Sequence, residues 1–474
     1  MEREITVIPK PAIINYNGGI FSSDKTPGLK KIENGKIKND FNDEAYKLII
    51  EKDNIKIEAG TDAGFFHAEQ TFRQLVLSET KDGILTLPCA EITDFPRFGW
   101  RGFMLDCSRY FYSLDFIKNL LDVLSMHHIN KFHWHLTDDQ GWRLNVKEYP
   151  LLTEIGSLRK DNRMRWREPF GGFYSEEEIL GVISYAKTLH IEVIPEVDLP
   201  GHASAILASY PELGCTGGPY HVEDRFGIFE DVLCAGNERI FDLMEKIIDT
   251  LVKLFPSKYV HIGGDEVLFN RWEACPKCRK KLSELGLKKP QELQSWITCK
   301  LVQMLTDRGK TAIGWDEILE DTEQFKLPKD TVVMSWRGDK GGIKAAGLGH
   351  QVIMVPNTNG CYLDYKHLNV QEEPGQTFGG AASVYTSYMM DPIPPGINEQ
   401  DESKVLGGQG NLWSELIYAG KIAEYMIFPR ICAIAETVWT PKNEKNFENF
   451  AKRLEAHRRR LDNLGIQQYR GKLQ

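Results

Sequence analysis

Residues 131–139 have the sequence Lys-Phe-His-Trp-His-Leu-Thr-Asp-Asp, a short β-type run that ends in polar side chains. Further runs of this kind occur along the chain, and helix-like stretches lie between most of them. The eight expected strands are Gly102–Leu105, Lys131–Leu136, Glu192–Val197, Tyr259–Ile262, Thr311–Trp315, Thr331–Trp336, Gln351–Val355 and Val405–Gly408. Strands that alternate with helices are typical of an α/β fold with a parallel sheet. A count of eight favours a closed (β/α)8 TIM barrel over an open, doubly wound sheet.

Two of the expected helices have clear start signals. Ser113 precedes the stretch Leu114–His127, and serine is a favoured N-cap residue. Ser175 precedes Glu176–Leu189, and Glu178 three residues later completes a capping box. Further helices are expected over Glu238–Leu254, Glu292–Asp307 and, as a basic terminal helix, Asn446–Leu464. No G-x-G-x-x-G motif follows a strand, so a dinucleotide-binding fold gains no support.

The first ninety-odd residues have a different pattern. Short β-type runs such as Ile5–Ile8 are separated by Asn/Gly turns such as Asn17-Gly18-Gly19, and one amphipathic stretch covers Asp62–Leu77. A proline-bearing stretch around residue 96 ends this region. We therefore expect a small α+β domain over residues 1–96, followed over residues 97–474 by the (β/α)8 barrel with its C-terminal helix.

The composition is that of an ordinary globular protein. Of 474 residues, 42% are apolar and 26% are charged, which excludes disordered, collagen-like and coiled-coil classes. The net charge is −9 and no long basic run occurs, so nucleic acid is not expected as a partner. No stretch is apolar enough to predict a membrane-spanning segment. The first residues lack the pattern of a secretion signal, so we expect a cytoplasmic protein, or an exported one whose signal is absent from this sequence.

Nine cysteines are too few for a disulfide framework in a chain of this length. Cys215 and Cys234 flank a glycine-rich loop and could pair in an exported protein. Residues 275–278, Cys-Pro-Lys-Cys, form a single C-x-x-C motif, whereas a structural zinc site needs four ligands. Because no second C-x-x-C occurs at the usual spacing, the motif predicts a loop in a helix-rich insert better than it predicts zinc.

Almost every expected strand is followed by a carboxylate, an aromatic residue or both. In a TIM barrel, these positions face the active site. The candidate site residues are Arg109, Asp138, His202, Asp265, Glu266, Trp315, Trp336, Tyr362, Asp364, Trp413 and Glu415. Tryptophan rings suit the apolar C–H faces of a sugar, and carboxylates and arginine suit its hydroxyl groups. One tryptophan would more often belong to the core, but three at the ends of barrel strands indicate a sugar-binding pocket.

The adjacent carboxylates Asp265 and Glu266 are the sharpest feature of the sequence. They follow a strand and two glycines, Gly263 and Gly264, where the backbone can turn tightly and a ligand can come close. Two neighbouring carboxyls repel each other's charge, which raises the pKa of one of them. A carboxylic acid that stays protonated near neutral pH can act as general acid on a leaving-group oxygen. We therefore interpret the pair as catalytic rather than as a solvated acidic turn.

Four segments, in order along the chain, resemble glycoside hydrolase family 20, the β-N-acetylhexosaminidases. They are Arg101–Arg109, His133–Trp142, Pro195–His202 and His261–Glu266. The resemblance extends over the whole chain, including the small domain before the barrel. It implies exo-acting, retaining hydrolysis of terminal non-reducing β-linked N-acetylglucosamine in an oligosaccharide or glycoconjugate, without cofactor or metal, and it leaves N-acetylgalactosamine open as a second substrate. The 2-acetamido oxygen of the substrate would attack the anomeric carbon and form an oxazolinium intermediate, so this family is an exception to the two-carboxylate scheme.

The resemblance also implies a role for each site residue. Glu266 would be the general acid/base, Asp265 would orient the acetamido group and stabilise its charge, and Tyr362 would hydrogen-bond its oxygen. An internal nucleophile has a high effective concentration, so the enzyme need only hold it in place. The implied substrate-binding residues are Arg109 at the pocket floor, Asp364 and Glu415 at the outer hydroxyls, Trp315, Trp336 and Trp413 around the sugar, and Asp138 and His202 as support for the acid/base.

Two alternatives stay open at the level of the sequence. His133 and His135 stand two apart on a strand and point the same way, as in a metal-dependent barrel hydrolase, where His202 and Asp198 could be further ligands. The same pocket with a defective acid would be a non-catalytic sugar-binding protein. Within the first interpretation, release of a single sugar is favoured over release of a disaccharide, and the natural glycan and the oligomeric state are left open.

Overall fold

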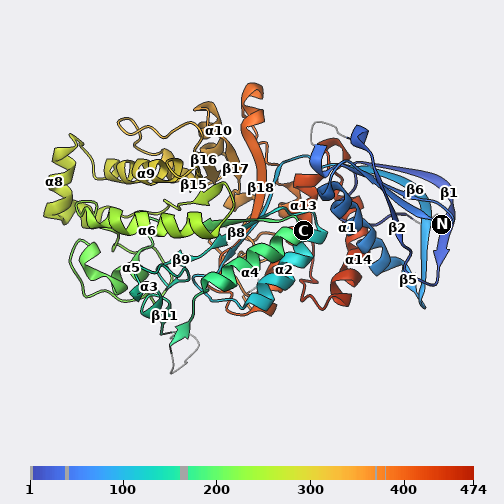
Figure 1. Ribbon diagram of the computed structural model, residues 1–474, viewed down its shortest axis with the longest axis horizontal. Helices are drawn as coiled ribbons and strands as arrows, with labels where there is room; N and C mark the ends of the chain where they lie inside the picture. Colours follow the sequence, from blue (N-terminus) through green and yellow to red (C-terminus); the bar gives the residue numbers. More distant parts are fainter. Residues whose placement is uncertain (1–3, 38–41, 161–168, 369–370, 379) are drawn as a thin grey trace.

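The structure is a computed structural model that describes residues 4–37, 42–160, 169–368, 371–378 and 380–474. A small N-terminal sheet, drawn in blue, lies at one end of the elongated molecule, and the barrel with its helices fills the rest (Figure 1). None of the described helices is both long and apolar enough to cross a bilayer.

Eight parallel strands close the barrel, in agreement with the prediction. They are β7 (Trp100–Asp106), β8 (Lys131–His135), β13 (Glu192–Glu196), β14 (Tyr259–His261), β15 (Thr311–Trp315), β16 (Val332–Ser335), β17 (Val352–Met354) and β18 (Val405–Leu412). Each strand pairs with the next in sequence, and β18 returns to β7, with Gly407 opposite Trp100. The last strand continues beyond Gly408, its expected end, to Leu412.

Helices cover the outside of the barrel. The longer ones are α2 (Leu114–Met126), α4 (Glu176–Thr188), α6 (Arg239–Leu254), α9 (Gln291–Thr306), α10 (Asp339–Gly347), α12 (Gly420–Ile427) and α13 (Arg430–Trp439). The expected capping box is present: the Glu178 amide donates to Ser175 Oγ at 3.2 Å, and the Ser175 amide donates to the Glu178 carboxylate at 2.8 Å. Helix α13 was not predicted, and all of its residues are buried in the core.

The N-terminal sheet has the strand order β1-β6-β3-β4-β2, and helix α1 (Asp62–Glu79) packs against it. Its strands are β1 (Ile13–Ser23), β2 (Leu29–Glu33), β3 (Tyr46–Ile50), β4 (Ile55–Ala59) and β6 (Ile84–Asp94), with the short β5 (Thr80–Lys81) beside β6. Alternate residues of β3 and β4 are fully buried, which is the pattern of a sheet whose one face is covered by a helix.

Two predictions for this domain are wrong. Residues 5–8 form no strand: their apolar side chains are buried, but the Ile8 amide donates to Gln74 Oε1 of α1 at 3.0 Å instead of to a neighbouring strand. Asn17-Gly18-Gly19 does not separate two strands but lies inside β1, where the pairing with β6 shifts between Tyr16 and Ile20. Gly18 and Gly19 have φ angles of 69° and 99°, which a β-bulge tolerates at glycine.

The C-terminal part of the chain joins the two domains. The predicted terminal helix is present as α14 (Phe447–Asn463), is capped by Asn446 and packs against α1. Trp439, at the end of α13, is fully buried in the core of the N-terminal domain, and its Nε1 donates to Asp94 at 3.0 Å. The small domain therefore rests on the closing segments of the barrel.

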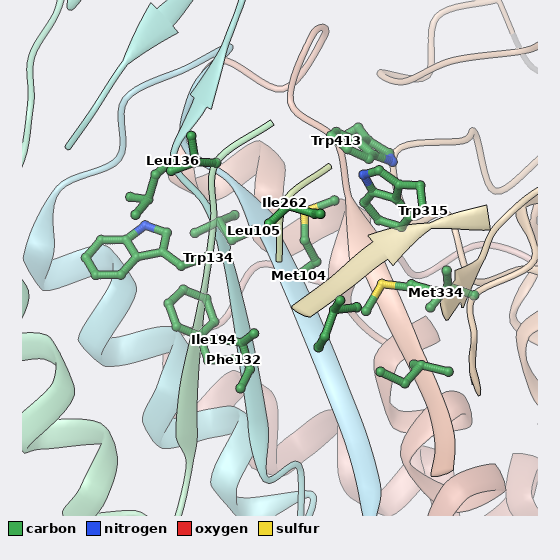
Figure 2. Packing of buried hydrophobic residues seen from close by; sticks show 14 of the residues in the cluster. Met104, Leu105, Phe132, Trp134, Leu136, Ile194, Ile262, Trp315, Met334 and Trp413 are labelled. Atoms are coloured by element: carbon green, nitrogen blue, oxygen red, sulfur yellow. The ribbon is translucent and has the colours of Figure 1, made fainter. Parts of the chain in front are cut away.

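Buried apolar side chains pack on and between the barrel strands, among them Met104, Phe132 and Ile194 (Figure 2). Trp315 and Trp413 lie beside each other at one end of this packing, with ring centroids 5.8 Å apart. Both come from carboxyl ends of strands, so they mark the end of the barrel at which TIM-barrel sites are built.

Candidate active site

A cavity of about 980 Å³ opens at the carboxyl ends of the barrel strands. Of the predicted site residues, these eight line it: Arg109, Asp265, Glu266, Trp336, Tyr362, Asp364, Trp413 and Glu415. The other three, Trp315, Asp138 and His202, lie behind its wall and contact the residues that form it. Residues that are far apart in sequence thus meet around one cavity.

The turn after β14 places the two adjacent carboxylates. A side chain at Gly263, where φ is 66°, would come within 1.8 Å of Asp198 Oδ1, so only glycine fits there. The Gly264 amide donates to the same carboxylate at 2.9 Å. Glu266 itself has a φ of 53°, a strained conformation that concentrates at functional sites. The two glycines therefore let the backbone turn sharply enough to bring both acids to the cavity.

His202 links these acids to a second carboxylate pair. Its Nδ1 lies 3.1 Å from Asp138 Oδ1 and 3.1 Å from Asp139 Oδ2. Its Nε2 lies 3.8 Å from Asp265 Oδ2 and 3.7 Å from Glu266 Oε2. Burial opposes the protonation of the ring, but Asp138 and the other acids together raise the pKa of His202 well above its ordinary value. A protonated imidazole at this position can hold both acids of the turn in place.

Asp265 is a buried carboxyl with an unfilled acceptor. Burial and then the charge of Asp198 raise the pKa of Asp265 well above its ordinary value, and Glu266 contributes less than Asp198 does. The sequence suggested the adjacent Glu266 as the main perturbing neighbour, but that neighbour is Asp198, in the segment after β13. Among the described residues, Oδ1 of Asp265 has no hydrogen-bond partner. Because buried polar atoms are rarely left unpaired, this oxygen is available to a ligand.

Three aromatic rings wall the cavity. Trp336 and Tyr362 stack with centroids 6.1 Å apart and an interplanar angle of 11°, and Trp413 lies 6.3 Å from Tyr362. Trp315, which was expected to enclose the sugar, is 1% exposed and supports Trp413 from behind. Its Nε1 donates to Glu196 Oε1 at 2.9 Å, and this bond draws the ring into the barrel.

Arg109 and Asp364 supply the polar part of the cavity. Arg109 is 2.8 Å from Asp138, donates to Gln140 Oε1 at 3.0 Å, and lies over the ring of Trp413 at 5.1 Å. Burial and then the charge of Glu415 raise the pKa of Asp364 well above its ordinary value. Asp364 Oδ1 is a further buried oxygen without a partner in the described part of the chain. A fixed guanidinium beside such carboxyls suits the hydroxyl groups of a sugar.

The metal-site alternative is not favoured by the positions of the four expected ligands, although His133 lies with Glu196 and His261 in one buried cluster. His133 and His135 both turn to Glu196, at 2.9 and 2.5 Å, and His261 joins them at 3.0 Å. All four side chains are fully buried in the barrel and do not line the cavity. The other two ligands that the sequence suggested lie elsewhere: His202 and Asp198 meet at Asp265. The expected set of four ligands is therefore not assembled.

Sequence reasoning missed two loops at the cavity mouth. Residues 226–228, Phe-Gly-Ile, lie between β13 and α6, and residues 375–378, Gly-Gln-Thr-Phe, follow Asp364. Both contain a glycine and an exposed apolar residue: Ile228 is 48% exposed and Phe378 is 89% exposed. This pattern, in a loop at the carboxyl end of a barrel, was the available signal, because such loops carry specificity in this fold.

Arg430 is a positioning residue that the sequence also concealed. Tyr362 and Asp364 lie in a loop after β17, and Tyr362 pairs with Asn411 of β18. The guanidinium of Arg430 donates to the carbonyl oxygens of Leu363 at 2.5 Å, Tyr365 at 2.7 Å and Ala382 at 2.9 Å. A fully buried arginine at the start of α13 therefore fixes the loop that bears two cavity residues.

We expect Arg430→Met to lower both stability and substrate affinity. The change leaves several buried carbonyl groups unpaired, at about 1–3 kcal/mol each. The free energy of unfolding should fall by at least about 2 kcal/mol, and KM should rise because the loop with Tyr362 and Asp364 loosens. Denaturant titration and steady-state kinetics measure the two effects. Arg459→Met, on the exposed face of α14, is the matched control and should leave both unchanged.

A (β/α)8 barrel with an acid pair and an aromatic-walled, polar-floored cavity at its carboxyl face has the architecture of a glycoside hydrolase. The comparisons with known proteins narrow this class. The family model "Glycosyl hydrolase family 20, catalytic domain" matches residues 98–442, and "Glycosyl hydrolase family 20, domain 2" matches residues 21–95. The chain belongs to glycosyl hydrolase family 20.

Its relatives are similar over most of the chain. A beta-hexosaminidase of Porphyromonas gingivalis is 41% identical over 90% of this chain, and one of Vibrio furnissii is 36% identical over 82%. The chain spans 54% and 64% of the length of these two proteins. Among solved structures, an exo beta-N-acetylglucosaminidase of Vibrio harveyi in complex with N-acetylglucosamine is 31% identical, with a TM-score of 0.89 over 98% of this chain and 78% of that one.

Proposed function

We propose that the protein is an exo-acting, retaining β-N-acetylhexosaminidase that removes terminal β-linked N-acetylglucosamine by substrate-assisted catalysis. The observation that carries the proposal is the arrangement of Asp265, Glu266 and Tyr362 on one cavity, with a buried oxygen of Asp265 unpartnered in the described chain. The names of the family-20 relatives, two beta-hexosaminidases and an exo beta-N-acetylglucosaminidase, support it.

In the first step, the acetamido oxygen of the substrate attacks the anomeric carbon while Glu266 gives its proton to the glycosidic oxygen. The bond to the leaving sugar breaks, and a positively charged oxazolinium ion remains in the cavity. In the second step, a water molecule attacks the anomeric carbon from the face that the leaving sugar has vacated, and Glu266 takes a proton from this water. The oxazolinium ring opens, and the configuration at the anomeric carbon is retained overall. The internal nucleophile is already held in place, so much of the entropic cost of the attack is avoided.

The unequal burial of the two acids matches these roles. The side chain of Glu266 is 31% exposed, so it can meet both a leaving sugar and the incoming water. The side chain of Asp265 is 11% exposed and lines the same cavity as the aromatic residues, between which the acetamido group would lie. A carboxylate in this dry part of the site stabilises a positive charge far better than one in water.

The experiment that tests the proposal combines two chromogenic substrates with one inhibitor. The 4-nitrophenyl β-glycosides of N-acetylglucosamine and N-acetylgalactosamine should both be tried, and N-acetylglucosamine thiazoline should inhibit far below KM, because it mimics the oxazolinium ion. Hydrolysis without inhibition would mean that the acetamido group is not the nucleophile. Failure to hydrolyse either glycoside or a terminal disaccharide unit would leave a sugar-binding protein.

We expect Tyr362→Phe to be a mild variant. The change removes one hydroxyl that would donate to the acetamido oxygen, while the ring still stacks on Trp336. The loss of one hydrogen bond of about 0.5–1.5 kcal/mol should reduce kcat/KM about two- to tenfold. Steady-state kinetics on the 4-nitrophenyl glycoside measures it, and an unchanged kcat/KM would remove Tyr362 from the mechanism.

A further inference from the structure

Four cysteines meet at the end of the molecule opposite the N-terminal sheet, where α8 (Pro276–Glu284) lies (Figure 1). Cys215 and Cys234 come from the segment between β13 and α6, and Cys275 and Cys278 come from the start of α8. Their four sulfur atoms all lie within 4.8 Å of one another, and three of the four side chains are buried. The C-x-x-C motif thus has its second pair of cysteines, with Cys234 41 residues before Cys275 and Cys215 63 residues before Cys278.

The sulfur atoms have the spacing of a tetrahedral metal site. Cys234 Sγ lies 3.6 Å from Cys278 Sγ and 3.8 Å from Cys275 Sγ, and Cys215 Sγ lies 3.7 Å from Cys278 Sγ. Four sulfurs bound to one zinc ion at about 2.3 Å are about 3.8 Å apart. Two disulfides would need two separate pairs at about 2.0 Å. Here Cys234 and Cys278 each contact two other sulfurs, so the cluster does not divide into pairs.

The surrounding backbone suits a cluster of thiolates. Cys275 is the N-cap residue of α8 and Cys278 lies in its first turn, so the positive end of the helix dipole faces these sulfurs. Four thiolates and one Zn²⁺ have a net charge of −2, and the basic residues 277 and 279–281 of the same helix offset it. A side chain at Gly236 would come within 2.2 Å of the Lys277 carbonyl carbon, so glycine is needed for the two segments to approach.

We propose that Cys215, Cys234, Cys275 and Cys278 bind one structural zinc ion. Binding releases the thiol protons and ties the 211–234 segment to the helical insert that follows Glu266. The same two segments are also linked by Arg271, 2.7 Å from Asp231, and by Trp272, which donates to the Leu233 carbonyl at 2.8 Å. Residues 226–228 belong to the 211–234 segment and line the cavity. By fixing this segment, the metal would also fix one wall of the active site.

Metal analysis of the purified full chain tests the proposal without reference to activity. We expect about one zinc per chain in elemental analysis, and X-ray absorption should give four sulfur neighbours at about 2.3 Å. Cobalt added to the demetallated, reduced protein should give the visible spectrum of tetrahedral cobalt thiolate. Removal of zinc by a chelator should lower Tm, and the return of zinc should restore it.

A matched pair of variants locates the ion. Cys278→Ser should lose zinc, whereas Cys299→Ser, whose half-buried sulfur lies outside the cluster, should retain it. If Cys278→Ser does not fold, the sulfur coordination measured on the unaltered protein decides. Zinc with nitrogen or oxygen neighbours, retention of zinc by Cys278→Ser, absence of both zinc and cobalt binding, or disulfides among these four cysteines would overturn the proposal.

Discussion

Glu266→Gln is expected to lower kcat on β-linked oligosaccharides by about a hundred- to ten-thousandfold, the usual contribution of a general acid/base. The amide cannot give a proton to the glycosidic oxygen, so the leaving sugar would have to depart as an alkoxide. Glutamine keeps the size of the side chain, and Glu266 makes no direct hydrogen bond that holds the fold together among the described residues. Substrate should therefore still bind, and Tm should stay close to that of the unaltered protein.

The choice of leaving group makes this prediction specific to acid catalysis. The leaving group of an aryl glycoside is a stabilised phenolate, which depends less on protonation than a sugar does. In Glu266→Gln, the rate of the first step should therefore fall less for the aryl glycoside than for an oligosaccharide. Glu273→Gln, an exposed carboxylate on the following helix, is the matched control and should behave as the unaltered protein. Equal losses on both substrates, or full activity of Glu266→Gln, would contradict the acid/base role.

The barrel could be predicted because its strands and helices have local signatures. Short apolar runs with helices of period 3.6 between them identify (β/α) units, and the serines before α2 and α4 mark where those helices begin. Helix α13 was not among the predicted helices, and only the structure shows that it is buried on every side. The strand expected at residues 5–8 failed because an apolar run shows that a segment is buried, but not what satisfies its backbone.

The site was predictable to the extent that TIM barrels place function at strand ends. That rule brought most candidates to one cavity, but it does not say which side chains reach the ligand and which support those that do. Trp315 follows a strand as Trp336 does, and only the bond to Glu196 shows that it lies behind the wall. Residues that act through long-range contacts, such as Arg430 on three carbonyl groups, leave no mark in the neighbouring sequence.

Asp265→Asn is expected to be the second severe variant, with kcat/KM on N-acetyl substrates reduced at least about a hundredfold, the range of a lost electrostatic contact in a dry site. Asparagine is nearly isosteric, but it carries no charge to stabilise the oxazolinium ion. In the unaltered protein Asp265 lies beside Asp198, and burial above all raises the pKa of Asp198 to about 6. The substitution replaces one carboxyl of this pair with an uncharged amide. The thiazoline should therefore bind more weakly to this variant, while its affinity for Glu266→Gln falls less.

The acid side of the pH profile gives an independent test of the same residue. Burial and Asp198 raise the pKa of Asp265, and only its ionised form can stabilise a cation. In the unaltered enzyme, kcat/KM should therefore fall on acidification at a pH above the ordinary range of an aspartate, because Asp265 and Asp198 titrate as a coupled pair. In Asp265→Asn this part of the acid limb should be lost, whereas Asp330→Asn, an exposed control, should keep it. An unchanged profile and full thiazoline affinity in Asp265→Asn would mean that the charge of this residue does not act on the intermediate.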